Sequence, residues 1–262
     1  MTELLLLTDR HPDGSVWITL NRPQIHNAFD DQLIAELTAE LIRLSEDPGV
    51  RAVVLTGSGN SFSAGADLNW MRRTADYGEA ENLADARALA KLMSTLNELP
   101  KPTVARVNGA ALGGGTGLVA CCDIVVASVE AVFGTTEVRL GLIPAVIGPY
   151  VVAAIGVRQA RRLMLTGERI GAAEAARIGL VHEVVEVDQL DGAIGTILRD
   201  LLRGGPGALT AAKRLIRDLA GRPIGPDLID GTAERIAALR ATAEAREGVA
   251  AFLGKRPASW LP

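Results

Sequence analysis

Two small-residue turns of the chain could direct backbone N–H groups at a bound ligand. In the first, Gly113, Gly114 and Gly115 follow the apolar run Thr103–Val107 and lead into a short apolar helical pattern. Several N–H groups at the start of a helix lack a partner, and the helix dipole adds partial positive charge there. Glycine lets a ligand approach that backbone closely. Such a turn suits an anion or a developing oxyanion, although three glycines can also form only a flexible turn.

The second turn lies upstream. The apolar stretch Arg51–Thr56 indicates a buried strand, and it continues into GSGNSFSAGADL at residues 57–68. Two such turns can aim two backbone N–H donors at one oxygen, which is how an oxyanion hole works. The two turns together are far more specific than either alone, and they predict a site that stabilises developing negative charge.

Glu137 is the side chain best suited to move a proton at such a site. It lies between Phe133 and the apolar run Leu140–Ile143, and a carboxylate in apolar surroundings has a tunable pKa. The residues alone leave a second interpretation open, an ion pair at the surface with Arg139 as the partner. The presence of both glycine turns favours the catalytic interpretation.

The composition excludes several classes of protein. A chain of 262 residues that is 48% hydrophobic can bury a large core without disulfides or metals. The net charge is −4 and no long basic run occurs, which argues against binding to nucleic acid. Two adjacent cysteines, Cys121 and Cys122, lie in an apolar run and are expected to be reduced core residues.

Known site motifs and targeting segments are also missing. The histidines His11, His26 and His182 have no metal-ligand spacing, so no metal site is expected. Neither GxGxxG nor GxxxxGK[ST] occurs at the glycine turns, and no GxSxG element marks a serine nucleophile. The apolar run Leu4–Leu7 is too short for a signal peptide or a membrane span. We therefore expect a soluble, cytoplasmic protein without a membrane partner.

Strands and helices alternate along most of the chain, which indicates an α/β fold. A strand pair, a helix and a strand are expected first, at Leu4–Leu7, Val16–Asn21, Asn27–Asp47 and Val50–Thr56. A long helix should follow at Tyr77–Leu99, and further strands at Val104–Val107, Ile124–Ala127 and Val181–Val185. After Val187 the composition becomes rich in Ala, Arg and Leu, and its Gly and Pro breaks predict three helices.

Several motifs together resemble the enoyl-CoA hydratase/isomerase (crotonase) superfamily, nearly end to end. Besides the two turns, they are LNRPQIHNAF (20–29), FGTTEVRLGLIP (133–144), TGERIGAAEAARIGLVHEVV (166–185) and FLGKR (252–256). SAGADLNWM, ALGGGTGLVACCD and LGLIPAVIGPYVVAAIG are similar to the methylglutaconyl-CoA hydratase type. The resemblance implies a spiral of ββα units over residues 1–187. It also implies a C-terminal helical part over 188–262 that forms a trimer or a dimer of trimers.

The resemblance also assigns roles to particular residues. The backbone N–H groups of Ala66 and Gly114 would hold the oxygen of an acyl-CoA thioester, and Glu137 would transfer a proton at the α-carbon. No further cofactor is implied, because coenzyme A is part of the substrate. The residues expected to bind the CoA portion are Arg22, Ala64, Gly65, Asp67, Leu68, Gly113, Phe252 and Lys255. Among them, Asp67 is expected to stabilise its turn rather than to act as a base.

The sequence departs from the best-known hydratases at two places. Those enzymes carry a second glutamate three residues after the oxyanion glycine, where this chain has Gly117. Hydration would then depend on Glu137 alone, on help from Glu79, Glu81 or Asp85, or on an acid of the substrate. Bulkier residues at Pro144–Tyr150 indicate a short, branched or carboxylated acyl group. We expect a hydratase, with a Δ3,Δ2-enoyl-CoA isomerase or a noncatalytic CoA-binding protein as alternatives.

Overall fold

The larger sheet of the computed structural model, which describes residues 4–261, has six strands in the order β1-β2-β3-β5-β7-β10. The first pair is antiparallel and every later pair is parallel. The strands are β1 (Leu6–Arg10), β2 (Ser15–Leu20), β3 (Ala52–Gly57), β5 (Thr103–Val107), β7 (Ile124–Ser128) and β10 (Glu183–Val185). The central strands are apolar on both faces because helices or the core cover both faces of a parallel sheet. The α/β class is thereby confirmed.

A smaller sheet has the order β4-β6-β8-β9. Its strands are short: β4 (Ser61–Ser63), β6 (Ala110–Leu112), β8 (Val132–Gly134) and β9 (Ile170–Gly171). The first three run parallel, and each follows directly on a strand of the larger sheet. A long strand, a short strand and then helical structure therefore recur three times, as the resemblance predicted.

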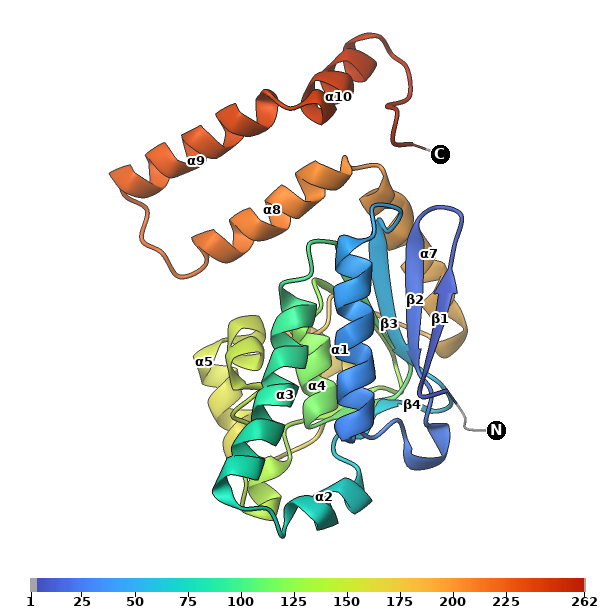
Figure 1. Ribbon diagram of the computed structural model, residues 1–262, viewed down its shortest axis with the longest axis vertical. Helices are drawn as coiled ribbons and strands as arrows, with labels where there is room; N and C mark the ends of the chain where they lie inside the picture. Colours follow the sequence, from blue (N-terminus) through green and yellow to red (C-terminus); the bar gives the residue numbers. More distant parts are fainter. Residues whose placement is uncertain (1–3, 262) are drawn as a thin grey trace.

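The helix α1 (Asp31–Glu46) buries Leu33, Leu37, Leu41 and Leu44, as their spacing predicted. It begins four residues later than expected. Asp30 caps it by accepting a hydrogen bond from Leu33 N–H at 2.9 Å, so Asp30 lies just outside the helix. Before it comes a 3-10 turn, Pro23–Ile25, and then two residues with φ of 54°. In Figure 1, α1 lies beside α3 (Glu79–Asn97), the helix expected at Tyr77–Leu99.

The first strand also differs from the prediction. It was expected at Leu4–Leu7 and lies at Leu6–Arg10, where Leu6 pairs with Leu20 and Arg10 with Val16. β1 is at the edge of the sheet and largely exposed, so polar residues suit it and hydrophobicity alone misplaces it.

The remaining helices connect these strands. They are α2 (Leu68–Thr74), α4 (Gly114–Cys121), α5 (Gly148–Thr166) and α6 (Ala172–Arg177), with 3-10 turns at Glu137–Leu140 and Val187–Gln189. Cys121 and Cys122 are buried and free, as expected. No helix within residues 4–261 combines the length and the apolar composition that crossing a bilayer requires.

The C-terminal part contains four helices, not the three expected. They are α7 (Leu190–Leu202), α8 (Pro206–Leu219), α9 (Pro226–Arg240) and α10 (Ala243–Leu253). The break that the prediction missed follows Ala241, where the Thr242 hydroxyl accepts a hydrogen bond from Ala245 N–H and caps α10. Leu190, Ile194 and Leu198 pack α7 on the larger sheet. Figure 1 shows α8, α9 and α10 extending beyond the sheets as an arm.

Candidate active site

Three adjacent strand ends bring the predicted catalytic residues to one edge of the smaller sheet. β4, β6 and β8 are parallel neighbours, so their carboxyl ends lie together. Ala66 follows β4 by three residues, Gly114 follows β6 by two, and Glu137 follows β8 by three. The two glycine turns and the carboxylate, widely separated in the sequence, thus share one edge.

The turn after β4 presents the Ala66 amide. Phe29 N–H donates to Gly65 O at 2.6 Å, and Asp67 N–H donates to Phe29 O at 2.7 Å. In this parallel bridge both bonds go to the neighbours of Ala66, so its own N–H points away from Phe29. Within residues 4–261 that N–H donates no hydrogen bond. Gly65 has a φ of +89°, and a Cβ there would lie 2.9 Å from Leu112 O.

The turn after β6 presents the Gly114 amide. Gly113 has a φ of +52°, and its N–H donates to Gly134 O in β8 at 2.8 Å. Gly114 is the first residue of α4, so its N–H has no acceptor within the helix. The buried Thr116 hydroxyl donates to Ala111 O at 2.7 Å and accepts from Gly134 N–H, which fastens α4 to β6 and β8.

Glu137 lies directly beside this second turn. A Cβ on Gly113 would lie 3.3 Å from Glu137 Oε1. The other carboxylate oxygen, Oε2, is buried and has no hydrogen-bond partner among the described residues. Burial raises the pKa of this carboxyl above its ordinary value. The Arg139 side chain lies beside Gly167, and among the described residues it forms no ion pair with Glu137, so the surface pair that the sequence left open is not formed. A carboxyl whose pKa is raised in this way is suited to accept a proton and to return it.

The place of a second glutamate is filled by apolar side chains. A Cβ on Gly117 would lie 2.8 Å from Ile147 Cβ and 3.3 Å from Met93 Cε. Both side chains are buried, and Ile147 comes from the bulky segment that the sequence singled out. The two departures from the best-known hydratases are therefore linked, because Ile147 of the bulky segment packs directly on Gly117.

The three acidic residues considered as helpers are positioned by α3. Asp85 Oδ1 accepts a hydrogen bond from Trp70 Nε1 at 3.2 Å, and burial raises the pKa of Asp85. Glu81 Oε2 accepts from Gly78 N–H at 2.9 Å at the start of the helix, and Glu79 is exposed. Their assistance in the reaction stays a prediction.

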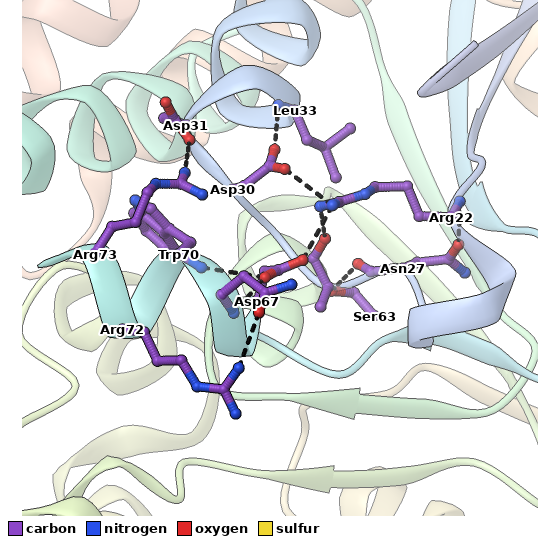
Figure 2. Close-up of polar contacts among 12 residues, drawn as sticks. Arg22, Asn27, Asp30, Asp31, Leu33, Ser63, Asp67, Trp70, Arg72 and Arg73 are labelled. Atoms are coloured by element: carbon purple, nitrogen blue, oxygen red, sulfur yellow. Dashed lines mark hydrogen bonds and ion pairs between the residues drawn. The ribbon is translucent and has the colours of Figure 1, made fainter. Parts of the chain in front are cut away.

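Arg22 and Asp67 belong to one ion-pair cluster, which Figure 2 shows. Arg22 Nη2 lies 2.9 Å from Asp30 Oδ2 and 3.0 Å from Asp67 Oδ2, and the Arg22 side chain is 13% exposed. Asp67 Oδ1 accepts from the N–H groups of Asn69 and Trp70, so it caps α2. Although burial opposes ionisation, these two donors and Arg22 lower the pKa of Asp67. Asp67 thus stabilises its turn as expected. Phosphate binding by Arg22 stays a prediction, because two carboxylates already balance its charge.

The other predicted CoA contacts are more scattered. Ala64 N–H donates to His26 O at 2.9 Å, and Leu68 is exposed at the first residue of α2. Phe252, 82% exposed, lies in α10, and Lys255 follows that helix. Figure 1 shows α10 at the opposite end of the molecule from α2. Contact of these two residues with CoA stays a prediction.

Two features were not anticipated from the sequence. The sequence indicated no separate role for Phe29, yet its backbone forms hydrogen bonds with the turn of Ala66 and its ring lies against Gly114. A cavity of about 690 Å³ at the far end of α4 is lined by Cys122, Tyr150 and Lys213 but not by Glu137. Within residues 4–261, no three His, Cys, Asp or Glu side chains are grouped as a metal site would need.

The chain is similar to known proteins along nearly its whole length. A model of the family described as "Enoyl-CoA hydratase/isomerase" matches residues 11–261. A crystal structure of an enoyl-CoA hydratase from Shewanella pealeana is 42% identical and superposes with a TM-score of 0.95, covering 98% of this chain and 96% of that one. The 2,3-dehydroadipyl-CoA hydratase of Escherichia coli is 36% identical over 91% of this chain and 92% of its own. The crotonyl-CoA hydratase of Syntrophomonas wolfei is 34% identical over 92% of each.

The paired sheets with their recurring ββα units define a crotonase-type fold. The chain belongs to the enoyl-CoA hydratase/isomerase family and is an enzyme of that family.

Proposed function

We propose that this enzyme is an enoyl-CoA hydratase, which adds water across the 2,3-double bond of an enoyl-CoA thioester. The observation that carries the proposal is the meeting of Ala66, Gly114 and Glu137 at the ends of three adjacent strands. The amides of Ala66 and Gly114 would both donate to the thioester oxygen, and Glu137 would move the proton. No cofactor beyond the CoA of the substrate is required.

The proposed reaction passes through an enolate. The ionised Glu137 takes a proton from water as the water oxygen bonds to C3. The double-bond electrons move toward the thioester and charge builds on its oxygen, where two N–H donors stabilise the transition state more than the substrate. Protonated Glu137 then gives its proton to C2. The sum is one water added, and a single carboxyl suffices for both proton transfers.

The acyl group is proposed to be short, branched or carboxylated. Ile147 packs on Gly117 and reduces the room beside α4. One relative is named 2,3-dehydroadipyl-CoA hydratase, and a dehydroadipyl group is a carboxylated acyl group. The methylglutaconyl-CoA type, with a group both branched and carboxylated, stays the more specific prediction.

Product analysis tests the proposal against its two alternatives. The purified protein is incubated with 2-enoyl, 3-enoyl and 3-methylglutaconyl thioesters of CoA, and products are identified by mass. Hydration adds one water, whereas the Δ3,Δ2-isomerase alternative gives a product of unchanged mass with a shifted double bond. A protein that binds CoA but converts none of the thioesters would support the noncatalytic alternative and contradict ours. A long straight-chain substrate with a higher kcat/KM than short branched ones would overturn the proposed acyl group.

A homotrimer, or a hexamer built from two trimers, is proposed as the working assembly. The arm leaves large apolar side chains exposed in one chain, including Ile229, Ile236, Phe252 and Leu253. Burying such a surface against another copy removes apolar area from water. Phe252 and Lys255 would then contact the CoA of a neighbouring chain. Sedimentation equilibrium should give three or six times the chain mass, and a monomer at micromolar concentration would contradict the assembly.

A further inference from the structure

Phe29 contacts the backbone of both turns whose amides the proposed reaction uses. Its backbone forms the two hydrogen bonds that flank Ala66, at 2.6 and 2.7 Å. Its ring packs on the α-carbon of Gly114 so closely that a Cβ there would overlap ring atom Cε2. The residue is 2% exposed, so the surrounding core holds the ring in place. Phe29 is therefore a spacer between the turn after β4 and the first residue of α4.

The backbone on either side of this spacer is fastened by Arg22. Asp30 directly follows Phe29 and Asp67 directly follows Ala66, so a carboxylate stands next to each member of the bridged pair. Arg22 Nη2 contacts both carboxylates, and Nη1 donates to Ala28 O at 2.7 Å. Figure 2 shows the guanidinium between Asp30 and Asp67. Three contacts from one planar fork join residues 28–30 to the turn of Ala66.

Both carboxylates are also helix caps, which makes the arrangement stiff. Asp30 Oδ1 accepts from Leu33 N–H at the start of α1, while Asp67 Oδ1 accepts from Asn69 N–H at the start of α2. Each carboxylate thus uses one oxygen for its helix and the other for Arg22. Because Arg22, Asp30 and Asp67 have side chains only 13%, 17% and 8% exposed, water competes weakly for these contacts.

We propose that Phe29, held by Arg22, is the positioning residue that sets the separation between the amides of Ala66 and Gly114. The inference rests on the proposed function, because that separation matters only if one oxygen accepts from both amides. Neither side chain needs to touch substrate. Phe29 acts through its contact with each turn, and Arg22 acts by keeping Phe29 and Ala66 in register.

Two conservative variants test this proposal. Phe29→Leu keeps an apolar side chain but removes the ring atoms that face Gly114. Arg22→Lys keeps the positive charge but removes the planar guanidinium that contacts both Asp30 and Asp67. A misplacement of about 1 Å can cost a reaction on the order of 100-fold. We therefore expect kcat to fall about 10- to 100-fold in each variant, with the Kd for free CoA unchanged.

A spectroscopic readout separates positioning from mere loss of stability. Acetoacetyl-CoA has an acidic α-carbon, and its enolate absorbs in the near ultraviolet, so the bound enolate fraction reports how well the two amides stabilise the oxyanion. Both variants should lower that fraction at saturating ligand. A weakened Kd for free CoA in Arg22→Lys, with the enolate fraction kept, would instead make Arg22 a phosphate ligand and overturn its positioning role.

Matched controls are available in the same region. Leu44→Ala opens the same core about 20 Å further along α1, and it should lower Tm without changing kcat or the enolate fraction. Arg73→Lys alters the exposed ion pair with Asp31, the first residue of α1, and should change neither kcat nor the enolate fraction.

If the wild-type protein does not ionise acetoacetyl-CoA, the proposed function fails. If it does, and Phe29→Leu ionises the ligand equally well, the positioning inference fails alone.

Discussion

Replacement of Glu137 by Gln should lower kcat/KM about 10²- to 10⁴-fold, the range that general acid–base groups contribute. Gln has nearly the same shape, so the packing beside Gly113 is kept while the proton acceptor is lost. In the wild type, kcat/KM should fall as pH decreases through the raised pKa of Glu137, because only the ionised carboxyl can accept the proton of water. The measurement is kcat/KM against pH for both proteins with an enoyl-CoA.

The same substitution should make the protein more stable at neutral pH. Burial raises the pKa of Glu137 in the folded state, so ionisation costs folding free energy above that pKa. The folded state therefore loses stability as pH rises through the raised pKa, whereas Gln has no charge to lose. The gain in Tm of Glu137→Gln should be present at pH 7 and should disappear below the ordinary value of 4.5.

Glu130→Gln is the matched control for both measurements. Glu130 is exposed in the turn before β8 and makes no ion pair among the described residues. It should change neither kcat/KM nor the dependence of Tm on pH. A Glu137→Gln protein with near wild-type activity would remove Glu137 from the mechanism, whatever happens to its stability.

Replacement of Gly114 by Ala should lower kcat about 10²- to 10³-fold, the usual effect of losing one oxyanion donor. The donor is a main-chain N–H, so the substitution acts by moving it rather than by deleting it. The new Cβ would overlap the ring of Phe29, and either the ring or the first turn of α4 must shift. Overpacking of this kind also costs about 1–3 kcal/mol of stability. Single-turnover rates on protein that is shown to be folded would separate the two effects.

Gly192→Ala provides the comparison for this variant. Gly192 likewise lies in the first turn of a helix, α7, and a Cβ there meets no atom within 4 Å. It should leave kcat unchanged and should not lower Tm. Equal activities of Gly114→Ala and Gly192→Ala would show that the Gly114 amide does not hold the reacting oxygen.

Local sequence patterns predicted most helices and strands. They failed where exposure at a sheet edge or a single capping side chain set the bounds of an element. The four leucines of α1 predicted its buried face, because a period near 3.6 residues leaves few other arrangements. The edge strand β1 was misplaced because exposed residues need not be apolar. The start of α1 and the break before α10 were missed because a single side-chain cap, Asp30 or Thr242, decides each.

The sequence by itself determined the α/β class, the two glycine turns and the candidacy of Glu137, because glycine spacing and apolar periodicity are local properties of a chain. Only the tertiary structure decided that Phe29 separates the two amides, that Arg22 joins Asp30 to Asp67, and that Ile147 fills the space beside Gly117. These contacts join residues that are far apart in the chain. They depend on which strands become neighbours, and no local pattern encodes that pairing.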